Sequence, residues 1–407
     1  GQGPGTELTT LVGVDTAEGA AKALRTTAAI RERARFLLQR ARAGRSRWFT
    51  VDDNALPTAA HEVAEVTLAR YPDLNIPFHS RWRHFEAGGV DRATGLDAHA
   101  MVDLAVVSVL LDAGAGPDWH YDEADSGLRF ARSEGLGVAS WQAFAAGLFS
   151  SDDAHPRQAD AAGLRQLDVD RLADAFQVGP SNPMVGLDGR VSVLHRLGDA
   201  LADQPEVFAQ GRPGGLFDVL TAARGPVSAP DILALVLVSF SRIWPADNVI
   251  GDQPLGDCWH HEAVPGPGLT AGWMPFHKLS QWLTYSLLEP FEWAGVRIHG
   301  LEELTGLPEY RNGGLLLDTG VLRLNDPEWA ERPLAVGDEL VVEWRALTVA
   351  LLDELAVLVR SRLGVDAERM PLACVLEGGT WAAGRALASR LRAGLPPLSI
   401  TSDGTVF

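Results

Sequence analysis

The stretch with the most versatile chemistry is residues 75–92, NIPFHSRWRHFEAGGVDR. Within 18 residues it holds two histidines, three arginines, two acids and three aromatic rings. An arginine presents a rigid fork of donors to a carboxylate, a phosphate or a urea-like carbonyl, and an aromatic ring stacks on a base or sugar. The pattern therefore predicts a substrate-binding segment with these candidates: His79, Arg81, Trp82, Arg83, His84, Asp91 and Arg92. The alternative is a network of arginines and acids that fixes a loop to the core.

Two further acids, Asp252 and Asp257, lie in a long Gly/Pro-rich stretch without a periodic pattern, residues 245–267. Long loops of this kind often form lids or walls of active sites, so both acids are candidate catalytic carboxylates. The Cys-Trp-His-His run at 258–261 contains metal-ligand residue types. Its spacing matches no structural zinc pattern and a second cysteine pair is missing, so we expect no tightly bound metal.

Lys278 is one of only two lysines in a chain that otherwise uses arginine. On a helix, Lys278 and Gln281 are three residues apart and share a face. We predict that both bind substrate, through sugar hydroxyls or a carbonyl. The neighbouring His277 is interpreted as a structural histidine.

A helix is expected to begin near Pro308 and Glu309, because proline and an acid both suit a first helical turn. Glu309 is the leading candidate for a catalytic carboxylate, with Tyr310 and Arg311 as binding residues. The partial positive charge of a helix start favours an anion, so we expect the pKa of Glu309 to be lowered. The alternative is a capping acid beside a surface arginine.

Near the end of the chain, Gly378, Gly379 and Thr380 are expected to open a helix. Backbone N–H groups at such a start bind anions, and Arg385 adds a positive charge, so these four residues are candidates for phosphate binding. Tight helix packing is an equal explanation for the glycine pair.

The elements that must position these residues are mainly helices. Apolar residues recur at three- and four-residue steps, which is typical of amphipathic helices. The expected helical ranges are 20–43, 56–70, 95–113, 140–149, 169–176, 191–201, 229–243, 276–291 and 340–363. Strand patterns are confined to 294–298, 320–324 and 397–400. We therefore predict a mainly α fold with a few short strands around one main core.

Composition narrows the classes of protein. The 407 residues include 53 acids against 35 basic side chains, a formal net charge of −18. This charge opposes binding to nucleic acid or to an anionic membrane. The longest apolar run, residues 232–238, is far shorter than the roughly 20 residues of a membrane span. No secretory signal is expected, and two distant cysteines fit a reducing cytoplasm. These features of the sequence do not predict an oligomeric state.

Three motifs resemble the fungal and bacterial uracil-catabolism (URC) family. They are the His79–Phe85 run with Asp91 and Arg92, the Glu377–Arg385 stretch, and the terminal Ser402–Phe407. The resemblance covers nearly the whole chain. It implies a pathway that converts uracil to a nucleotide, opens the pyrimidine ring and releases urea, with ribosylurea species as intermediates.

A more distant resemblance links the chain to the queuosine-salvage N-glycosidases, helical proteins related to helix-hairpin-helix DNA glycosylases. The motifs are Arg190–Gly198, Phe276–Gln281 and Glu309–Arg311, in the same order. That family has Asp at the position of Glu309 and an acid at the position of Ser286. The resemblance implies three regions: an N-terminal helical region (1–126), a nucleosidase-like core (127–330), and a C-terminal helical segment packed on it (331–407).

Both resemblances imply hydrolysis of the bond between ribose C1′ and a urea-type nitrogen. The step needs a carboxylate near C1′ and donors on the leaving group, and it needs no metal and no cofactor. The substrate is then a small nucleoside or its 5′-phosphate. Two alternatives stay open, an amidohydrolase acting on the opened ring and a non-catalytic sensor of a pyrimidine metabolite. A DNA glycosylase is opposed by the charge.

Overall fold

The computed structural model describes residues 13–244 and 247–401, and they are mainly helical with short strands. The predicted mainly α class with a few short strands is therefore confirmed. The described chain divides into two compact units, and each combines segments that are distant in sequence. Unit 1 contains residues 13–79, 247–278 and 301–401, and unit 2 contains 80–244 and 279–300. The terminal motif at 402–407 lies outside the described residues.

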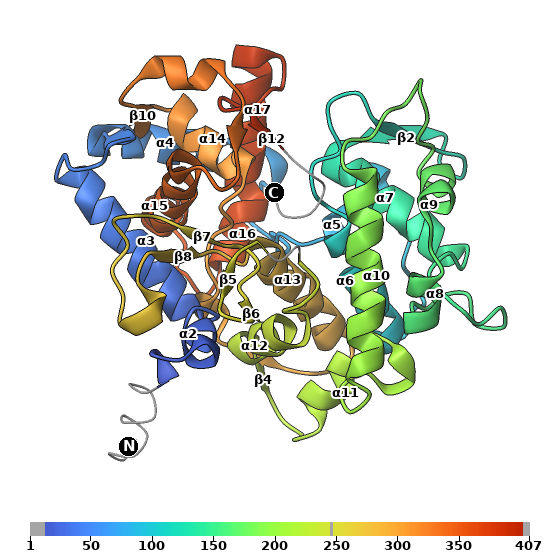
Figure 1. Cartoon of the computed structure of the whole chain (residues 1–407). Helices are drawn as coiled ribbons and strands as arrows, with labels where there is room; N and C mark the ends of the chain where they lie inside the picture. The colour runs from blue at the N-terminus through green and yellow to red at the C-terminus, as the bar shows by residue number, and fades with distance from the viewer. Residues whose placement is uncertain (1–12, 245–246, 402–407) are drawn as a thin grey trace. The chain divides into compact units, whose positions relative to one another are not determined.

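Unit 1 is built around the long helix α15 (Glu339–Leu363), which packs against α3 and α4 (Figure 1). Nearly every α15 side chain from Leu340 to Leu352 is buried, and Gly364 ends the helix in the left-handed conformation (φ 69°). The other helices of this unit are α2 (Ala17–Ala23), α3 (Thr27–Arg42), α4 (Leu56–Arg70), α14 (Tyr310–Asp318), α16 (Leu372–Val375) and α17 (Trp381–Arg392).

The strands of unit 1 are short and form separate pairs. Antiparallel pairs join β1 (Phe49–Val51) with β10 (Leu322–Leu324), β5 (Val249–Ile250) with β6 (Gln253–Pro254), and β7 (Cys258–His260) with β8 (Trp273–Pro275). A parallel pair joins β11 (Leu334–Ala335) with β12 (Ile400–Thr401). The pair β7–β8 brings the chain to the start of α13, where candidate site residues lie.

Unit 2 has the almost completely buried helix α6 (Ala98–Leu110) at its centre. Its other helices are α5 (Trp82–Phe85), α7 (Arg132–Ala145), α8 (Ala161–Arg165), α9 (Val169–Ala175), α10 (Leu187–Asp203), α11 (Gly215–Thr221), α12 (Ala229–Ser239) and α13 (Lys278–Trp293), whose first residue belongs to unit 1. The hairpin β2 (His120–Glu123) and β3 (Leu128–Ala131) packs against α7. The strands β4 (Val227–Ser228) and β9 (Ile298–His299) form a parallel pair.

The predicted helix bounds agree best with the structure where residues typical of helix starts and ends flank the periodic apolar pattern. The range predicted for α4, 56–70, agrees with the structure, and the range 20–43 forms two helices. The stretch 245–267 does contain structure, because β5, β6 and β7 lie within it, so its interpretation as patternless loop is wrong. The prediction of one main core is also wrong, since two compact units are present. The three consecutive regions remain a prediction.

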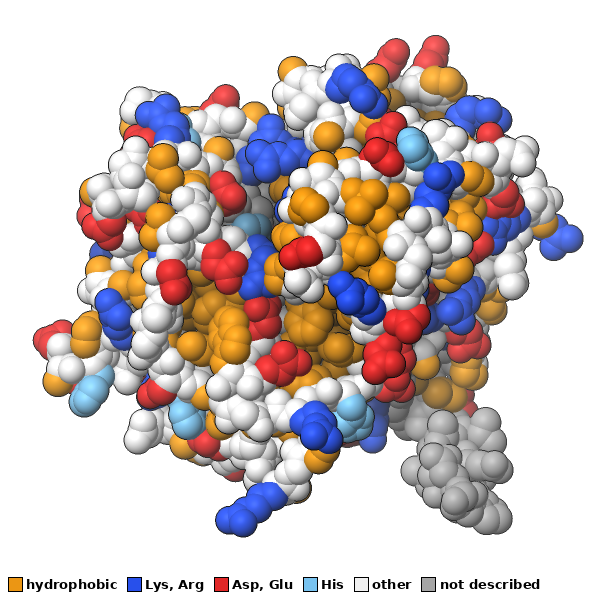
Figure 2. All heavy atoms as spheres, turned by 180° about the vertical axis from the view of Figure 1, so that it is seen from behind, with side chains coloured by type: hydrophobic (Ala, Val, Ile, Leu, Met, Phe, Trp, Pro, Cys, Tyr) orange, Lys and Arg blue, Asp and Glu red, His pale blue; other side chains and the backbone are white. Residues whose placement is uncertain are grey.

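Charged side chains of both signs are interspersed with apolar ones on the face drawn in Figure 2. The excess of acids is therefore not concentrated in one patch on that face. Among the described residues, the helices fall short of the length and apolar character that crossing a membrane requires.

Candidate functional site

Glu309 lies directly before helix α14 and caps it. Its two carboxylate oxygens accept hydrogen bonds from the backbone N–H groups of Arg311 (2.9 Å) and Asn312 (2.6 Å). The predicted helix start at this position is confirmed. The residue as a whole is half-buried, and its carboxylate is buried at the helix start.

The pKa of Glu309 is raised above its ordinary value, mainly because burial penalises the charged carboxylate. The two backbone N–H groups and the positive charges of Lys278 and His79 act in the opposite direction but do not outweigh burial. The expectation of a lowered pKa is therefore wrong, because desolvation exceeds the effect of the helix start. Lys278, His79 and Glu309 all belong to unit 1.

Asp257 is held by Arg345 of α15 in a bidentate ion pair, with N–O distances of 2.7 and 2.9 Å. The carboxylate also accepts from Trp259 Nε1 (2.6 Å) and from the backbone N–H of Lys278 (3.0 Å). Burial alone would raise its pKa, but Arg345 and these donors hold the pKa at about 2. A carboxylate so fully engaged is a poor base, and it serves instead to fix the start of α13.

Arg345 joins two parts of the candidate site. Its Nε donates to the carbonyl of Pro308 (3.0 Å), directly before Glu309, while its other nitrogens bind Asp257. The guanidinium lies 4.2 Å from the ring centroid of Phe276 and is almost fully buried. This one side chain therefore positions the segments that carry Lys278 and Glu309. No sequence motif pointed to Arg345, although an arginine inside an apolar helical run is a recognisable signal.

The second loop acid, Asp252, is exposed in the turn between β5 and β6, where it accepts from the side chain of Gln253 (3.3 Å). Its surroundings supply none of the burial or fixed partners that Glu309 and Asp257 have. Its predicted catalytic role therefore has no structural support, and Glu309 is the better candidate.

His79 forms a second charged group in unit 1, together with Glu377. His79 Nδ1 lies 3.1 Å from Glu377 Oε1, and both residues are buried. The other carboxylate oxygen accepts from Arg70 (3.0 Å) and from the Tyr71 hydroxyl (3.1 Å). The predicted binding role of His79 stays a prediction, and Glu377 is a partner that no sequence motif assigned to it.

The Gly378-Gly379-Thr380 stretch does not open a helix. It forms a π-helical segment, Leu376–Thr380, inside one helical run that begins with α16 and continues into α17. A Cβ on Gly379 would lie 2.6 Å from the carbonyl oxygen of Val63 and even closer to Thr67 Oγ1. The premise for phosphate binding is therefore wrong, and the glycines instead permit close packing on α4.

The other two candidates for phosphate binding, Thr380 and Arg385, contact other parts of the protein. Thr380 Oγ1 donates to the side-chain oxygen of Asn312 (2.9 Å), and Arg385 is exposed beside the ring of Trp381, 5.6 Å from its centroid. Phosphate binding by these residues stays a prediction without a structural argument.

The Cys-Trp-His-His run does not assemble a ligand set. Cys258 is buried in an apolar cluster, and burial raises the pKa of its thiol. His260 stacks on Trp273 (3.7 Å between ring centroids), and His261 Nε2 lies 3.0 Å from Glu343 Oε1. Within residues 13–244 and 247–401, no group of three or more His, Cys, Asp and Glu side chains is arranged to hold a metal.

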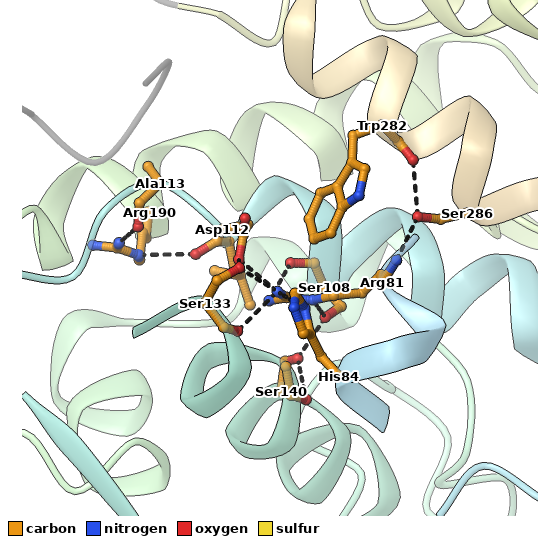
Figure 3. Close-up of polar contacts among 12 residues, drawn as sticks. Arg81, His84, Ser108, Asp112, Ala113, Ser133, Ser140, Arg190, Trp282 and Ser286 are labelled. Carbon is orange, nitrogen blue, oxygen red and sulfur yellow. Dashed lines mark hydrogen bonds and ion pairs between the residues drawn. The ribbon is translucent and has the colours of Figure 1, made fainter. Parts of the chain in front are cut away.

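Arg81 is the centre of a buried polar network in unit 2 (Figure 3). Its guanidinium binds Asp112 (2.5 Å), the hydroxyl of Ser108 (2.6 Å) and the carbonyl of Ser133 (3.0 Å). His84 Nδ1 lies 3.0 Å from the same guanidinium. The charge of Arg81 is thus compensated inside the protein, which favours the alternative of an arginine–acid network over direct substrate binding.

Other residues of the 75–92 segment also fix its conformation. Arg92 forms a buried ion pair with Glu123 (2.6 Å) and donates to the carbonyls of Phe85 and Ala87. Arg83 pairs with Glu289 (2.6 Å). Trp82 is buried and donates to the carbonyl of Ser286 (2.6 Å), whereas Asp91 is exposed.

The last three predicted binding residues differ in burial. Gln281 is fully buried in α13 within unit 2, and Tyr310 is partly exposed at the start of α14 in unit 1. Arg311 is buried and donates to the carbonyl of Gly394 (3.1 Å), so it is not a surface arginine. Arg81 and Glu309 belong to different units, and their predicted convergence on one pocket stays a prediction.

A cavity of about 630 Å³ in unit 2 was not anticipated by any motif. Its lining residues are Ser151, Asp152, His155, Gln158, Asp160, Ala161, Ala162, Gln210 and Arg212. Arg212 pairs with the fully buried Asp103 (2.8 Å), and burial raises the pKa of Asp103 to about 6. None of the predicted site residues lines this cavity.

Comparison with known proteins gives a family for almost the whole chain. Residues 23–407 match a family described as "Protein of unknown function (DUF1688)". "Protein urg3" of Schizosaccharomyces pombe is 39% identical over 402 residues, which span 93% of this chain and 96% of that protein. "Uracil catabolism protein 4" of Lachancea kluyveri is 38% identical over 379 residues, spanning 82% and 85%. The chain therefore belongs to the DUF1688 family, the uracil-catabolism (URC) family that its motifs indicated.

Proposed function

We propose that this protein acts in uracil catabolism as an N-glycosidase. It hydrolyses the bond between ribose C1′ and a urea nitrogen in a ribosylurea-type nucleoside or its 5′-phosphate, and it releases urea and ribose or ribose phosphate. The name of the relative "Uracil catabolism protein 4" supports the pathway. The similarity of three motifs to queuosine-salvage nucleosidases supports the type of bond, and a nucleosidase-like helical fold is part of the proposal.

The observation that carries the proposal is the carboxylate of Glu309 at the start of α14, on a segment that Arg345 and Asp257 join to the segment of Lys278. Cleavage of a glycosidic bond passes through a state in which the sugar resembles an oxocarbenium cation. An ionised Glu309 stabilises that cation and accepts a proton from the attacking water. Its raised pKa makes the ionised form a stronger base than an ordinary glutamate. Lys278 binds a ribose hydroxyl or the urea carbonyl.

The first test is to incubate the purified protein with ribosylurea and with its 5′-phosphate and to measure free urea and free ribose. Release of both products in equal amounts is expected for one of the two substrates. Absence of product from both substrates would contradict the proposed reaction.

The second test is the Glu309→Gln variant. We expect kcat to fall by about 10²-fold or more while KM changes little, because the lost charge matters mainly in the transition state. Gln keeps the volume and can still accept a hydrogen bond from the helix start. The matched control is Glu302→Gln, an exposed glutamate close to it in sequence, which should leave kcat unchanged. A folded Glu309→Gln protein with normal urea release would show that Glu309 only caps the helix.

A further inference from the structure

We propose that the cavity in unit 2 is a second binding site, for a neutral, hydroxyl-rich small molecule such as a free sugar. Its volume of about 630 Å³ lies within the roughly 300–1,000 Å³ of small-molecule sites. None of its lining residues belongs to the candidate site that contains Glu309. The proposal therefore goes beyond the proposed reaction, and it can be tested by binding without any turnover.

One buried carboxylate, Asp103 of α6, ties together two segments that line the cavity. It accepts hydrogen bonds from the backbone N–H groups of Ala159 (3.1 Å) and Gly214 (2.7 Å) and from Arg212 Nε (2.8 Å). Ala159 directly precedes the lining residue Asp160, and Gly214 follows the lining residue Arg212 by two positions. Because Asp103 is fully buried, both walls of the cavity are anchored to the core of unit 2.

Asp160 fixes one of these walls further. Its buried carboxylate accepts from the backbone N–H groups of Ser151 (2.9 Å) and Gly163 (2.9 Å) and from Gln158 Nε2 (3.0 Å). The amide oxygen of Gln158 has no donor among the described residues, and it is open to solvent. This wall therefore offers a ligand an acceptor whose position is already fixed, which lowers the entropic cost of binding.

Arg212 supplies hydrogen-bond donors on the other wall. Its Nε binds Asp103, and within residues 13–244 and 247–401 its two terminal nitrogens have no acceptor. Both are open to solvent, since neither is among the buried polar atoms that lack a partner. Two adjacent N–H donors on a rigid guanidinium match two neighbouring oxygens of a ligand.

A comparison of two glutamines in unit 2 points to the same cavity. Gln177 and Gln210 both have a left-handed backbone (φ 59° and 62°), which residues other than glycine seldom adopt. The amide of Gln177 is used by the fold, because it bonds both the N–H and the carbonyl of Asp122 (2.9 Å each). Gln210 lines the cavity, and its amide has no partner in the part of the chain that the structure describes. Its strained turn therefore adds an amide donor and acceptor to the cavity wall.

The charges of the lining favour a neutral ligand. Arg212 is balanced by Asp103, while Asp152 and Asp160 add negative charge, so the lining disfavours an anion. The guanidinium in turn disfavours a cation. A hydroxyl group both donates and accepts, so a ligand with several hydroxyls satisfies the donors and acceptors of both walls. The described residues that line the cavity include no Phe, Tyr or Trp on which a base would stack, which favours a sugar over a nucleobase.

The test measures binding of D-ribose, D-glucose and D-ribose 5-phosphate to the full chain at neutral pH by saturation-transfer-difference NMR. We expect saturable binding of at least one neutral sugar, and hydrogen exchange should show that this sugar protects segments 150–162 and 208–214. Absence of saturable binding for both neutral sugars, or protection confined to other segments, would overturn the proposal. Tighter binding of the phosphate ester than of ribose at these two segments would also overturn it, because it would show an anion site.

Two variants test the contacts with the sugar. Arg212→Lys keeps a positive charge beside Asp103 but removes the paired donors, so the dissociation constant should rise by about 10-fold or more. Gln210→Gly suits the left-handed backbone and removes the amide, so the dissociation constant should rise by about 3-fold or more. Gln210 is exposed, so this second variant decides the matter if Arg212→Lys does not fold.

Gln177→Gly is the matched control, because it changes a left-handed glutamine outside the cavity. If it remains folded by circular dichroism, it should keep the wild-type dissociation constant. Wild-type affinity in folded Gln210→Gly, or an equal loss in Gln177→Gly, would overturn the proposal. Because the readout is binding, failure of this proposal is distinct from failure of the protein to release urea.

Discussion

Glu309 and Asp257 show how the surroundings of a carboxylate determine its pKa and its chemical role. Asp257 is engaged by Arg345, Trp259 Nε1 and a backbone N–H, and its pKa is about 2. Glu309 accepts from two backbone N–H groups at the helix start, and burial raises its pKa. The first arrangement stabilises a permanent anion, whereas the second leaves an anion of higher energy that a positively charged reaction centre would stabilise.

The Asp257 ion pair predicts a specific dependence of stability on pH. A carboxyl whose pKa falls from the ordinary 3.8 to about 2 on folding stabilises the protein above pH 4 by about 2 kcal/mol, and that contribution is lost as the pH falls toward 2. Asp257→Asn should destabilise the protein at pH 7 by about 3–5 kcal/mol, because Arg345 is left buried without its partner charge. The difference in the free energy of unfolding between wild type and this variant should shrink by about 1 kcal/mol from pH 5 to pH 3.

Urea unfolding of wild type and variant at pH 7, 5 and 3 checks this prediction. Asp252→Asn is the matched control, because that acid is exposed in a turn, and its stability should stay within about 0.5 kcal/mol of wild type. A deficit for Asp257→Asn that does not change with pH would contradict the account.

At the scale of elements, the π-helical segment Leu376–Thr380 connects packing with the candidate site. Its glycines permit close approach to α4, where Thr67 and Val63 face them, and Glu377 in the same segment holds His79. The glycine pair is therefore explained by the distance between two helices rather than by anion binding. The same segment carries Glu377, whose carboxylate contacts His79, Arg70 and Tyr71.

Gly379→Ala should consequently destabilise the protein by about 1–3 kcal/mol, because the new methyl group would lie too close to the backbone of Val63. Activity on ribosylurea should fall as well, because Glu377 lies in this segment and contacts His79, a predicted substrate-binding residue. Chemical denaturation and steady-state kinetics measure the two effects. Gly114→Ala is the control, because a Cβ there meets no atom within 4 Å, and it should change neither quantity.

At the scale of the whole molecule, the two units are not consecutive regions of the chain. The helices α3, α4 and α15 of unit 1 come from both ends of the sequence, and residues 247–278 belong to the same unit. Unit 2 likewise combines residues 80–244 with 279–300. Each unit therefore needs chain segments from more than one of the three regions that the resemblance implied.

A fragment of residues 127–330 should therefore not fold on its own. It lacks α6, the buried centre of unit 2, and it lacks α3, α4 and α15 of unit 1. We expect no cooperative thermal unfolding and strong binding of a hydrophobic dye, in contrast to the full chain. Circular dichroism and dye fluorescence check this. A fragment with a sharp unfolding transition would support an independent nucleosidase-like core.

The sequence alone determined the fold class, several helices and the family. Helix α4 was predicted at its observed bounds, because helical periodicity and a proline near the helix start act within a few residues. The helix start at Glu309 was likewise predicted from adjacent residues, a proline and an acid that suit a first helical turn. The family motifs are likewise present in the linear sequence. By contrast, the two-stranded pairs of unit 1 were largely missed, because strands of two or three residues carry almost no alternating pattern.

Only the tertiary structure decided which charged residues are available for chemistry. Asp257 and Arg345 are 88 residues apart, and His79 and Glu377 are 298 residues apart. Arg81 and Arg92 were reasonable ligand candidates until the structure brought Asp112 and Glu123 to them. The physical reason is that the pKa and reactivity of a side chain depend on burial and on partners within a few ångströms, and long-range folding chooses those partners.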